Sequence, residues 1–518
     1  MMPNRSSDPL FLLIHSLEKA EKRNFKLYIK RNSAREDLKI IWLFDALDKL
    51  REYDEKLLLK KLTAIHKPQL ANLKAHLYRQ LLASLRVLKS TESIDLQLHE
   101  QLDHARILYN KGLYLQSLKI LERVKDLAKQ YHQESFLIQV ISLEKKIETL
   151  HITRSFEDRA DQLVLEADEV NQQRTLITRL SNLALQLYRW YVKNGHARNK
   201  KDEKGVVRFF KQQLPQEASS ATGFYERLYL FQSFCWYAFI RQDFLMYYRY
   251  SHKWVALFDR EPFMIPVETG HYIKGMHNLL TACFDLRNYK QFDYFLSRFE
   301  TFAEGEAANQ HYNFRMQTFV YLTSARINGH LMRGSFSEGV KLVPGIEKGL
   351  EKYASFIDRH RLLVIHYKTA LLYFGNADYA ASIDYLHRII NGPLDLRIDL
   401  QCYARLVHLL AHFELGNESI MESQIRSVYR FMLKMENLTV VEEEMFAFLR
   451  NNFYVSSKKI RPSLQAFLQK IKQFEKNRFE TRAFSYLDII SWVESKVYEK
   501  PMASIVQEKY LQNKHRFL

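Results

Sequence analysis

The sequence predicts an all-α protein built from repeated pairs of helices, an α-solenoid. The chain contains only 15 glycines and 10 prolines in 518 residues, about 3% and 2% against average usage of about 7% and 5%, so turns are few and the elements between them are long. One pattern of helix-start residues also recurs along the chain at intervals of 39 to 47 residues. Self-similarity at such a period is typical of helical-repeat architectures.

The clearest copy of the pattern is the segment at 375–393, GNADYAASIDYLHRIINGP. Asp378 is a good N-cap, because its carboxylate can accept hydrogen bonds from the free amides of the first turn. We expect Gly375 to end the preceding helix with a positive φ, and Asn391-Gly392-Pro393 to end this one. The residues between them place an apolar stripe on one helical face: Tyr379, Ile383, Leu386 and Ile390. A lone helix of this length is not stable in water, so the stripe must pack against a neighbouring helix.

A cap residue followed by an aromatic residue marks several helix starts along the chain. They are Asp243-Phe244, Asn288-Tyr289, Ser335-Phe336 and Asp378-Tyr379, with Gly416-Asn417 lacking the aromatic and Gly112-Leu113-Tyr114 lacking the cap. Glu338 follows Ser335 at the spacing that predicts a capping box.

Residues 97–440 resemble tetratricopeptide-like repeats. In that family the second helix of each unit begins near an aromatic, carries a small residue three positions later, and has apolar residues four and seven positions beyond it. Counted from the aromatic residues, the small position is Ser117, Phe292, Gly339 and Ser382, so only Phe292 departs. The resemblance implies a right-handed α-solenoid of antiparallel helix pairs with N- and C-terminal helical caps. The period of about 40 to 47 residues exceeds the 34 of the family, and the tryptophan-leucine-glycine signature of its first helices is missing. The whole chain also resembles uncharacterised bacterial helical-repeat proteins of similar length.

Changes in pattern divide the chain into five segments. We expect a basic N-terminal helical domain at 1–95, a first repeat segment at 96–193, a loop or elbow at 194–223, tetratricopeptide-like repeats at 224–450 and a basic C-terminal helical cap at 451–518. Segment 194–223 combines polar stretches with the apolar run VVRFF, which predicts a loop with a small docked element. The amphipathic stretch at 484–501 predicts a terminal cap or, alternatively, a dimerisation helix.

Three features of the sequence favour a cytoplasmic protein without a membrane anchor. The apolar run LFLLI near the N-terminus is short and charged residues follow it closely, unlike the core of a signal peptide. No stretch approaches the roughly 20 apolar residues that span a bilayer. The 3 cysteines are widely separated, which favours buried thiols in a reducing compartment.

The positive charge lies mainly at the two ends of the chain. The net charge is +18, to which residues 1–90 contribute 19 Lys and Arg against 10 Asp and Glu, and residues 451–518 contribute 13 against 6. Basic ends of this kind are solvated surface or attract an acidic partner such as nucleic acid.

The N-terminal segment has the outline of a helix-turn-helix. A short helix at about 54–62, a turn at 64–68 and a long helix with leucines on one face are expected, and basic side chains follow the flank of the long helix. The candidate nucleic-acid contacts are Lys67, Lys74, Arg79 and Arg86. The same pattern also describes a terminal helical cap whose long cationic side chains cover its rim.

A peptide groove is the second candidate site. In tetratricopeptide-like repeats the first helix of each pair lines the concave surface, and the family spacing implies eight residues there. They are Lys274, His277, Thr281, Phe284, Val364, Tyr367, Leu371 and Phe374. Aromatic and apolar anchors would supply affinity, while the lysine and histidine would orient a bound peptide. Alternatively, Val364, Leu371 and Phe374 are ordinary interhelical core.

Motifs of catalysis or cofactor binding are missing from the sequence, which has no glycine-rich phosphate loop, no paired CxxC and no HExxH. His408 and His412 are the best local metal candidate, but two ligands do not make a zinc site, and Glu414 falls on another side of the helix. We therefore expect no catalytic, cofactor or metal site. The expected function is a non-catalytic scaffold that binds a peptide or protein segment. The alternative is a nucleic-acid-linked regulator, and the sequence leaves the oligomeric state open.

Overall fold

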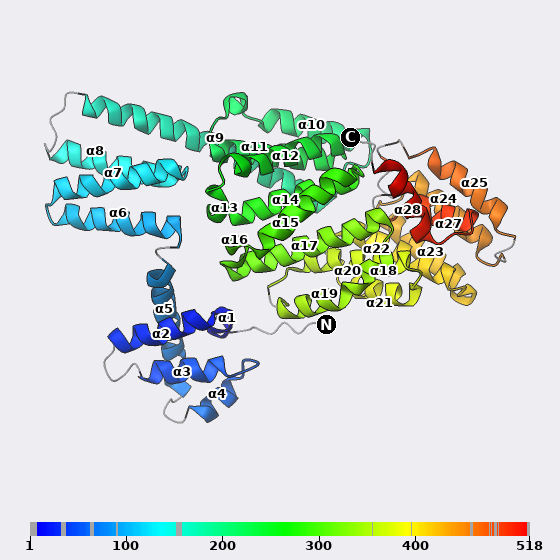
Figure 1. Ribbon diagram of the computed structural model, residues 1–518, viewed down its shortest axis with the longest axis horizontal. Coiled ribbons are helices and arrows are strands. Elements are labelled where there is room, and N and C mark those ends of the chain that lie inside the picture. Colours follow the sequence, from blue (N-terminus) through cyan, green and yellow to red (C-terminus); the bar gives the residue numbers. More distant parts are fainter. Residues whose placement is uncertain are drawn as a thin grey trace. The chain divides into compact units, whose positions relative to one another are not determined.

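The computed structural model describes residues 8–514, except 33–37, 63–66, 90–91, 152–157, 355, 395, 456–458, 476, 478, 481–483 and 485. All regular elements within these residues are helices (Figure 1), so the predicted all-α class is confirmed. The chain forms two compact units, Met1–Gln172 and Gln173–Leu518, and the boundary falls inside the long helix α9 (Arg159–Asn194).

The first unit contains two sets of helices with separate cores. Its helices are α1 (Pro9–Ser16), α2 (Lys19–Asn32), α3 (Leu38–Asp48), α4 (Glu55–Lys61), α5 (Lys67–Lys89), α6 (Ile94–Asn110), α7 (Tyr114–Gln130), α8 (Glu134–Leu150) and the first part of α9. Phe25, Phe44 and Leu77 belong to the core of α1 to α5, whereas Leu102 and Leu121 belong to that of α6 to α9. Helices α4 and α5 confirm the two predicted helices of the N-terminal hairpin, and its turn at 63–66 lies outside the described residues.

The second unit is a succession of helices in which neighbours along the chain pack together. After α9 come α10 (Lys200–Gln213), the 3₁₀ helix η2 (Gln216–Ser220), α11 (Phe224–Ile240), α12 (Phe244–Arg260), α13 (Met264–Val267), α14 (Thr269–Asp285), α15 (Tyr289–Glu304), α16 (Glu306–Asn309), α17 (Tyr312–Arg333), α18 (Phe336–Lys341), α19 (Val343–Lys352), α20 (Arg359–Gly375), α21 (Tyr379–Ile390), α22 (Ile398–Glu414), α23 (Glu418–Lys434), α24 (Val440–Asn452), α25 (Arg461–Lys472), α27 (Ile489–Val497) and α28 (Met502–Asn513). Helices α11, α14, α17, α20 and α22 begin successive pairs, and α14 packs on α17 and α17 on α20. The apolar element expected within 194–223 is the 14-residue helix α10.

The repeated sequence pattern is a repeated turn. At each helix start found in the sequence, the residue before the cap position has a positive φ: Gly112, Gln242, Arg287, Gly334, Ala377 and Gly416. The backbone N–H of the cap residue donates to the carbonyl five residues earlier, as in Asp243 to Ala238 (2.9 Å) and Asp378 to Tyr373 (3.0 Å). This hydrogen bond is the 6→1 bond of the Schellman motif, which satisfies the last carbonyls of a helix.

The sequence misplaced the left-handed residue of one turn. Ala377, with φ 61°, adopts this conformation, whereas Gly375 is the last residue of α20. Gly375 is required for another reason: a Cβ at this position would lie 2.6 Å from two ring carbons of Phe336. The glycine therefore lets the aromatic residue that opens α18 pack directly against the backbone of α20.

The caps at the repeated turns follow the sequence in part. The side chains of Asp243, Asn288 and Asp378 accept from backbone amides three residues later, at 3.1 to 3.3 Å. The capping box predicted at Ser335 is wrong, because the Ser335 side chain forms no cap bond and its hydroxyl instead pairs with Nδ1 of His330 at 2.9 Å. A partly buried imidazole competes here with the backbone for the hydroxyl.

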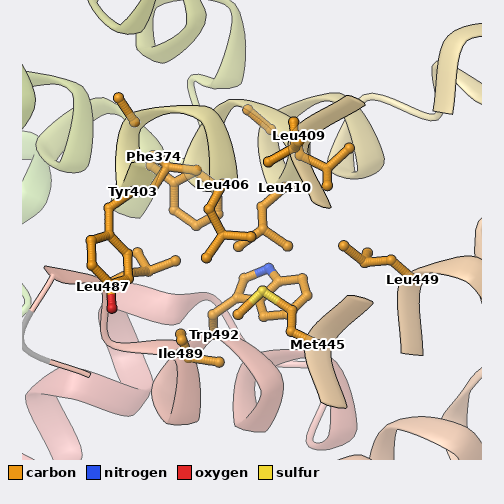
Figure 2. Close-up of a cluster of buried hydrophobic side chains, with 14 of the residues drawn as sticks. Phe374, Tyr403, Leu406, Leu409, Leu410, Met445, Leu449, Leu487, Ile489 and Trp492 are labelled. Atoms are coloured by element: carbon orange, nitrogen blue, oxygen red, sulfur yellow. The ribbon is translucent and has the colours of Figure 1, made fainter. Parts of the chain in front are cut away.

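The C-terminal helices complete the core of the second unit. Trp492 on α27 is 1% exposed and packs among residues of α20, α22 and α24, including Phe374, Tyr403 and Met445 (Figure 2). Its indole N–H donates to Oε1 of Glu414 at 2.6 Å. The apolar face of this stretch is thus buried within the chain itself, which supports the terminal-cap interpretation of 484–501 over the dimerisation helix.

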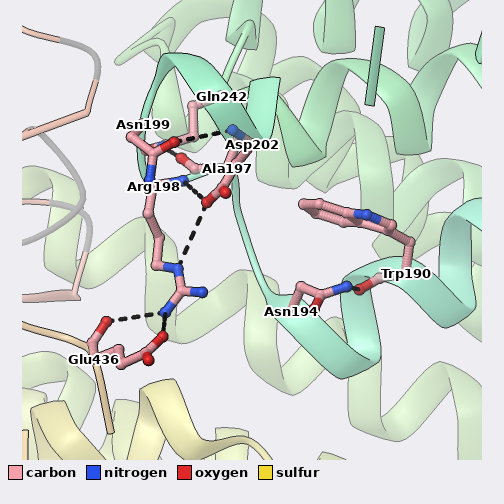
Figure 3. Close-up of polar contacts among 8 residues, drawn as sticks. All are labelled: Trp190, Asn194, Ala197, Arg198, Asn199, Asp202, Gln242 and Glu436. Carbon is pink, nitrogen blue, oxygen red and sulfur yellow. Dashed lines mark hydrogen bonds and ion pairs between the residues drawn. The ribbon is translucent and has the colours of Figure 1, made fainter. Parts of the chain in front are cut away.

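The connection between α9 and α10 contacts a distant part of the same unit. Nη1 of Arg198 donates to the carbonyl oxygen of Glu436 at 3.0 Å, in the turn after α23 (Figure 3). On its other side the connection is fixed to the α11–α12 turn, where Ala197 N donates to the Ile240 carbonyl (2.8 Å) and Gln242 Nε2 to the Ala197 carbonyl (3.1 Å). Residues 238 positions apart are therefore held together.

Substituting Gly375 with alanine tests the close approach of Phe336. We expect Gly375→Ala to lower the free energy of unfolding by about 1–3 kcal/mol, the usual cost of inserting a methyl group into a filled space. Gly205→Ala is the matched control, because Gly205 lies inside α10 with nothing within 4 Å of a built Cβ, and it should stabilise by about 0.5–1 kcal/mol. Chemical denaturation of both variants measures the difference; equal effects would contradict the packing argument.

Candidate functional site

A cavity of about 390 Å³ lies in the second unit. One face of each of α14, α17 and α20 lines it, and residues of α9, α11, α12 and α22, with Arg397 and Tyr486, also contribute to the wall. A volume of this size is in the range of sites that hold small molecules or short peptides.

The structure brings most of the predicted groove residues together at this cavity. Seven of the eight line it: Lys274, His277, Thr281, Phe284, Val364, Tyr367 and Leu371. Phe374 lies beyond its end, where it lines a much smaller cavity of about 50 Å³. Tyr367 and Phe374 are 4% and 2% exposed and belong to the hydrophobic core. The hydroxyl of Tyr367 donates to the carbonyl oxygen of Tyr486 at 3.1 Å, so this tyrosine contacts the C-terminal segment of the chain.

A lysine held between aromatic rings marks one end of the cavity. Nζ of Lys274 lies 5.2 Å from the ring centroid of Tyr321 and 5.9 Å from that of Trp236. Among the described residues no carboxylate lies within 4.0 Å of this ammonium group. Arg361 reaches the same tyrosine, since its Nη2 donates to the Tyr321 hydroxyl at 3.2 Å, and it also pairs with Asp358 at 2.9 Å.

The pKa shifts of two side chains, Tyr321 and His277, agree with a positive electrostatic potential at this end of the cavity. Burial would by itself raise the pKa of Tyr321, but Lys274 and Arg361 outweigh it and the pKa lies below its ordinary value. Burial, together with Lys274 and Lys368, holds the pKa of His277 well below its ordinary value. His277 is therefore neutral, and its ring stacks on Tyr321 with centroids 4.3 Å apart. An anion entering the cavity would meet uncompensated positive charge.

A second lysine enters the cavity from α20. Nζ of Lys368 donates to the hydroxyl of Ser324 at 2.5 Å, and no carboxylate of the described part of the chain lies within 4.0 Å of it. Burial lowers the pKa of Lys368 to about 8, against the attraction of Asp285. Lys368 is thus a mostly charged group that has lost most of its water without gaining a counter-ion.

Two acceptor side chains lie further along the cavity. Asp285, at the end of α14, has no hydrogen bond or ion pair to another described side chain, and burial raises the pKa of its carboxyl to about 7. Asn328 on α17 is 4% exposed, and its Oδ1 has no hydrogen-bond partner. Both line the cavity.

The chemistry of the cavity suits binding. Cys235 lines it, but burial raises the pKa of the thiol to about 12, so it stays protonated and is a poor nucleophile. Cationic and aromatic side chains surround an apolar interior, an arrangement that holds an anionic ligand with an apolar body.

Sequence reasoning missed five of the polar and charged residues discussed here: Asp285, Tyr321, Asn328, Arg361 and Lys368. A signal was available for two of them, because Arg361, Val364, Lys368 and Leu371 recur at steps of 3 and 4 on the first helix of a pair. The count by the family spacing selected Val364 and Leu371 from that face but did not select Arg361 and Lys368.

The basic N-terminal helix differs from the expectation at one position. Lys74 lies inside the first unit, where its ammonium pairs with Asp8 and donates to the Tyr53 hydroxyl at 2.8 Å. Lys67 and Arg79 are exposed on α5, and Arg86 pairs with Asp103 at 3.4 Å. Lys74 is therefore part of the unit's own packing, and DNA binding through the other three stays a prediction.

The histidines considered as metal ligands form a chain of ring contacts. Nε2 of His408 lies 3.0 Å from Nε2 of His387 and 3.3 Å from Nε2 of His412. Glu414 faces elsewhere and binds Trp492 and Lys496. No group of three or more His, Cys, Asp or Glu in the described part of the chain is arranged to hold a metal ion.

Comparison with protein-family models and with curated protein sequences gives no match for this chain. Within the described ranges, no helix combines the length and apolar character needed to cross a bilayer.

Acidification tests the buried histidines. Burial lowers the pKa of His360, His366 and His408 from 6.5 to about 4. The unfolded chain therefore binds more protons between pH 6.5 and 4, and stability should fall as the pH drops through this window. His408→Gln should lose less melting temperature than the wild type between pH 7 and 4.5, whereas His104→Gln, at an exposed position, should behave as the wild type. An unchanged pH profile of His408→Gln would contradict this assignment.

Removal of Lys74 tests its structural role. Lys74→Met leaves Asp8 without its cation while that carboxylate still caps α1 through the amides of Leu10 and Phe11. We expect the variant to lose about 1–3 kcal/mol, and hydrogen exchange of the α1 amides to accelerate. Arg79→Met, on the exposed face of the same helix, should change stability by no more than about 0.5 kcal/mol. If both variants unfold alike, Lys74 carries no structural contact.

Proposed function

We propose that the chain is a non-catalytic interaction protein and that its second unit binds a peptide segment in the 390 Å³ cavity. The observation that carries the proposal is the pair Lys274 and Lys368, two cations without a carboxylate partner among the described residues that face one aromatic-lined cavity. A buried charge without a counter-ion is costly. An acidic group on the ligand, a peptide carboxylate in the first instance, would remove this cost.

Residues from three successive first helices support a peptide as the ligand. Side chains of α14, α17 and α20 face the same space, so a linear molecule lying across these helices would contact each in turn. Concave surfaces of helical repeats present side chains in this way. Trp236, Tyr188 and Tyr191 supply broad apolar contact at the cavity wall, which is the usual role of aromatic residues in peptide recognition.

We further propose a right-handed solenoid of antiparallel, tetratricopeptide-like pairs in a bacterial cytoplasmic protein. The repeated three-residue turns support antiparallel pairing, because each reverses the chain between two helices. Cys235, Cys283 and Cys402 are free and buried, in agreement with a reducing compartment.

Replacing the two lysines tests peptide binding. The probe is a mixed pool of synthetic tripeptides with free ends, and retained peptides are quantified on immobilised full-length protein. We expect Lys274→Met and Lys368→Met each to reduce retention of acidic members at least tenfold, about 1.4 kcal/mol. Added salt should weaken the wild-type interaction.

Lys290→Met is the matched control, since Lys290 is exposed on α15, and it should bind as the wild type. Lys368→Met should also raise the melting temperature of the empty protein, because the substitution removes a buried charge. Retention that is equal in all three variants would reject the cavity as the binding site.

A further inference from the structure

Two acceptors in the cavity lack donors. The Asp285 carboxyl has no hydrogen bond or ion pair to the described residues, and the Oδ1 atom of Asn328 is buried without a partner. Buried acceptors are nearly always satisfied by protein, water or ligand. Both residues line the same cavity, so a ligand bound there can supply a donor to the Asp285 carboxyl.

The packing of the first helices places these two acceptors at the same level. His277 on α14 stacks on Tyr321 on α17, and Ser324 on α17 bonds Lys368 on α20. In both contacts the partners are 44 positions apart in the sequence. Asp285 and Asn328 are separated by 43 positions on α14 and α17, so this register places them at a similar level of the two helices.

The protein's own cations do not fill this place. Lys368 attracts Asp285 but is more than 4.0 Å from it and is bound to Ser324. Arg287 also attracts Asp285 without pairing with it. A carboxyl and an amide oxygen together form a site for a group that carries both positive charge and several N–H donors, and a primary ammonium is such a group.

A smaller cavity adjoins this one close to Asp285. Phe284, Leu331 and Leu371 line both this cavity and the small one beyond it. The small cavity holds only about 50 Å³, and Leu487, Met502 and Val506 of the C-terminal segment are among the residues that line it. This volume leaves little room for further residues of a peptide, so we expect the ammonium that reaches Asp285 to belong to the end of a chain.

The opposite end of the cavity suits the acidic part of the same ligand. Lys274 and Asp285 are separated by 11 residues of α14, about 16 Å at 1.5 Å per residue. An extended peptide covers about 3.3–3.6 Å per residue, so three residues with their terminal groups and the reach of the lysine side chain span this distance.

We propose that Asp285 and Asn328 form an amine-binding subsite for the free amino terminus of a short peptide whose acidic end lies toward Lys274. The inference rests on the proposed function of the cavity. It adds the direction in which the bound peptide lies and the short length of that peptide. A ligand bound in this way must have a free amino terminus, as a short oligopeptide has, whereas an internal segment of a longer protein has none.

Blocking the amino terminus of the probe tests the subsite. The full-length protein is challenged with two mixed tripeptide pools, one with free ends and one N-acetylated, and binding is measured by retention and by the shift in melting temperature. We expect the N-acetylated pool to bind at least tenfold more weakly. Acetylated peptides that contain lysine distinguish a side-chain ammonium from the terminal one: if they bind as well as the free pool, the terminal assignment is overturned.

Variants separate this proposal from general damage to the cavity. Asp285→Asn and Asn328→Ala should bind the free and acetylated pools nearly equally, whereas Asp384→Asn, an exposed position on α21, should keep the wild-type preference. Melting of the empty Asp285→Asn protein reports folding, and we expect it to be unchanged or raised at pH 8, where the wild type carries the buried charge. If wild type binds both pools alike, the subsite is rejected and peptide binding stands. If neither pool binds, both proposals fall.

Discussion

A short turn joins the two helices of each pair in the second unit, and one of its residues has a positive φ. This turn determines which residues of neighbouring helices face each other. A turn of three residues leaves the chain almost no freedom in how one helix follows another, because the last carbonyls of the first helix are bonded to the residues that start the second. One contact between α14 and α17 and one between α17 and α20 join residues 44 positions apart, His277 with Tyr321 and Ser324 with Lys368. The cavity is a consequence of this register, since it aligns one face of α14, α17 and α20.

The same register explains how single departures from the repeat are accommodated. Phe292 occupies a position where the other copies carry a small residue, and Gly329 on the neighbouring helix α17 leaves room for it: a Cβ on Gly329 would lie 3.3 Å from the Phe292 ring. At the next copy the relation is reversed, because Gly339 gives space to Leu372 on α20. In each contact a large side chain on one helix faces a glycine on the other, so the two residues together fill the space between the helices. This is expected for close-packed interiors.

Burial and charge are balanced differently in the core and in the cavity. Glu414 is buried beside Trp492, but it accepts from the indole N–H and pairs with Lys496 at 2.5 Å. Lys274, Lys368 and Asp285 receive no comparable partners within the described structure. The fold thus pairs the charge of Glu414 in its core but leaves these three charged groups unpaired around one cavity, where a ligand can reach them. Such unpaired groups are typical of functional sites.

The sequence by itself determined the helical class, the positions of most repeated turns and the face of α14 that lines the cavity. Those features depend on local chemistry: the caps at Asp243 and Asp378, the helical spacing of apolar residues, and the scarcity of glycine and proline. Only the tertiary structure decided which charges are compensated. Lys74 and Lys368 look alike in sequence, yet one is paired with Asp8 and the other faces an open cavity. The pairing of a side chain depends on residues brought near it by packing, and local pattern carries no information about them.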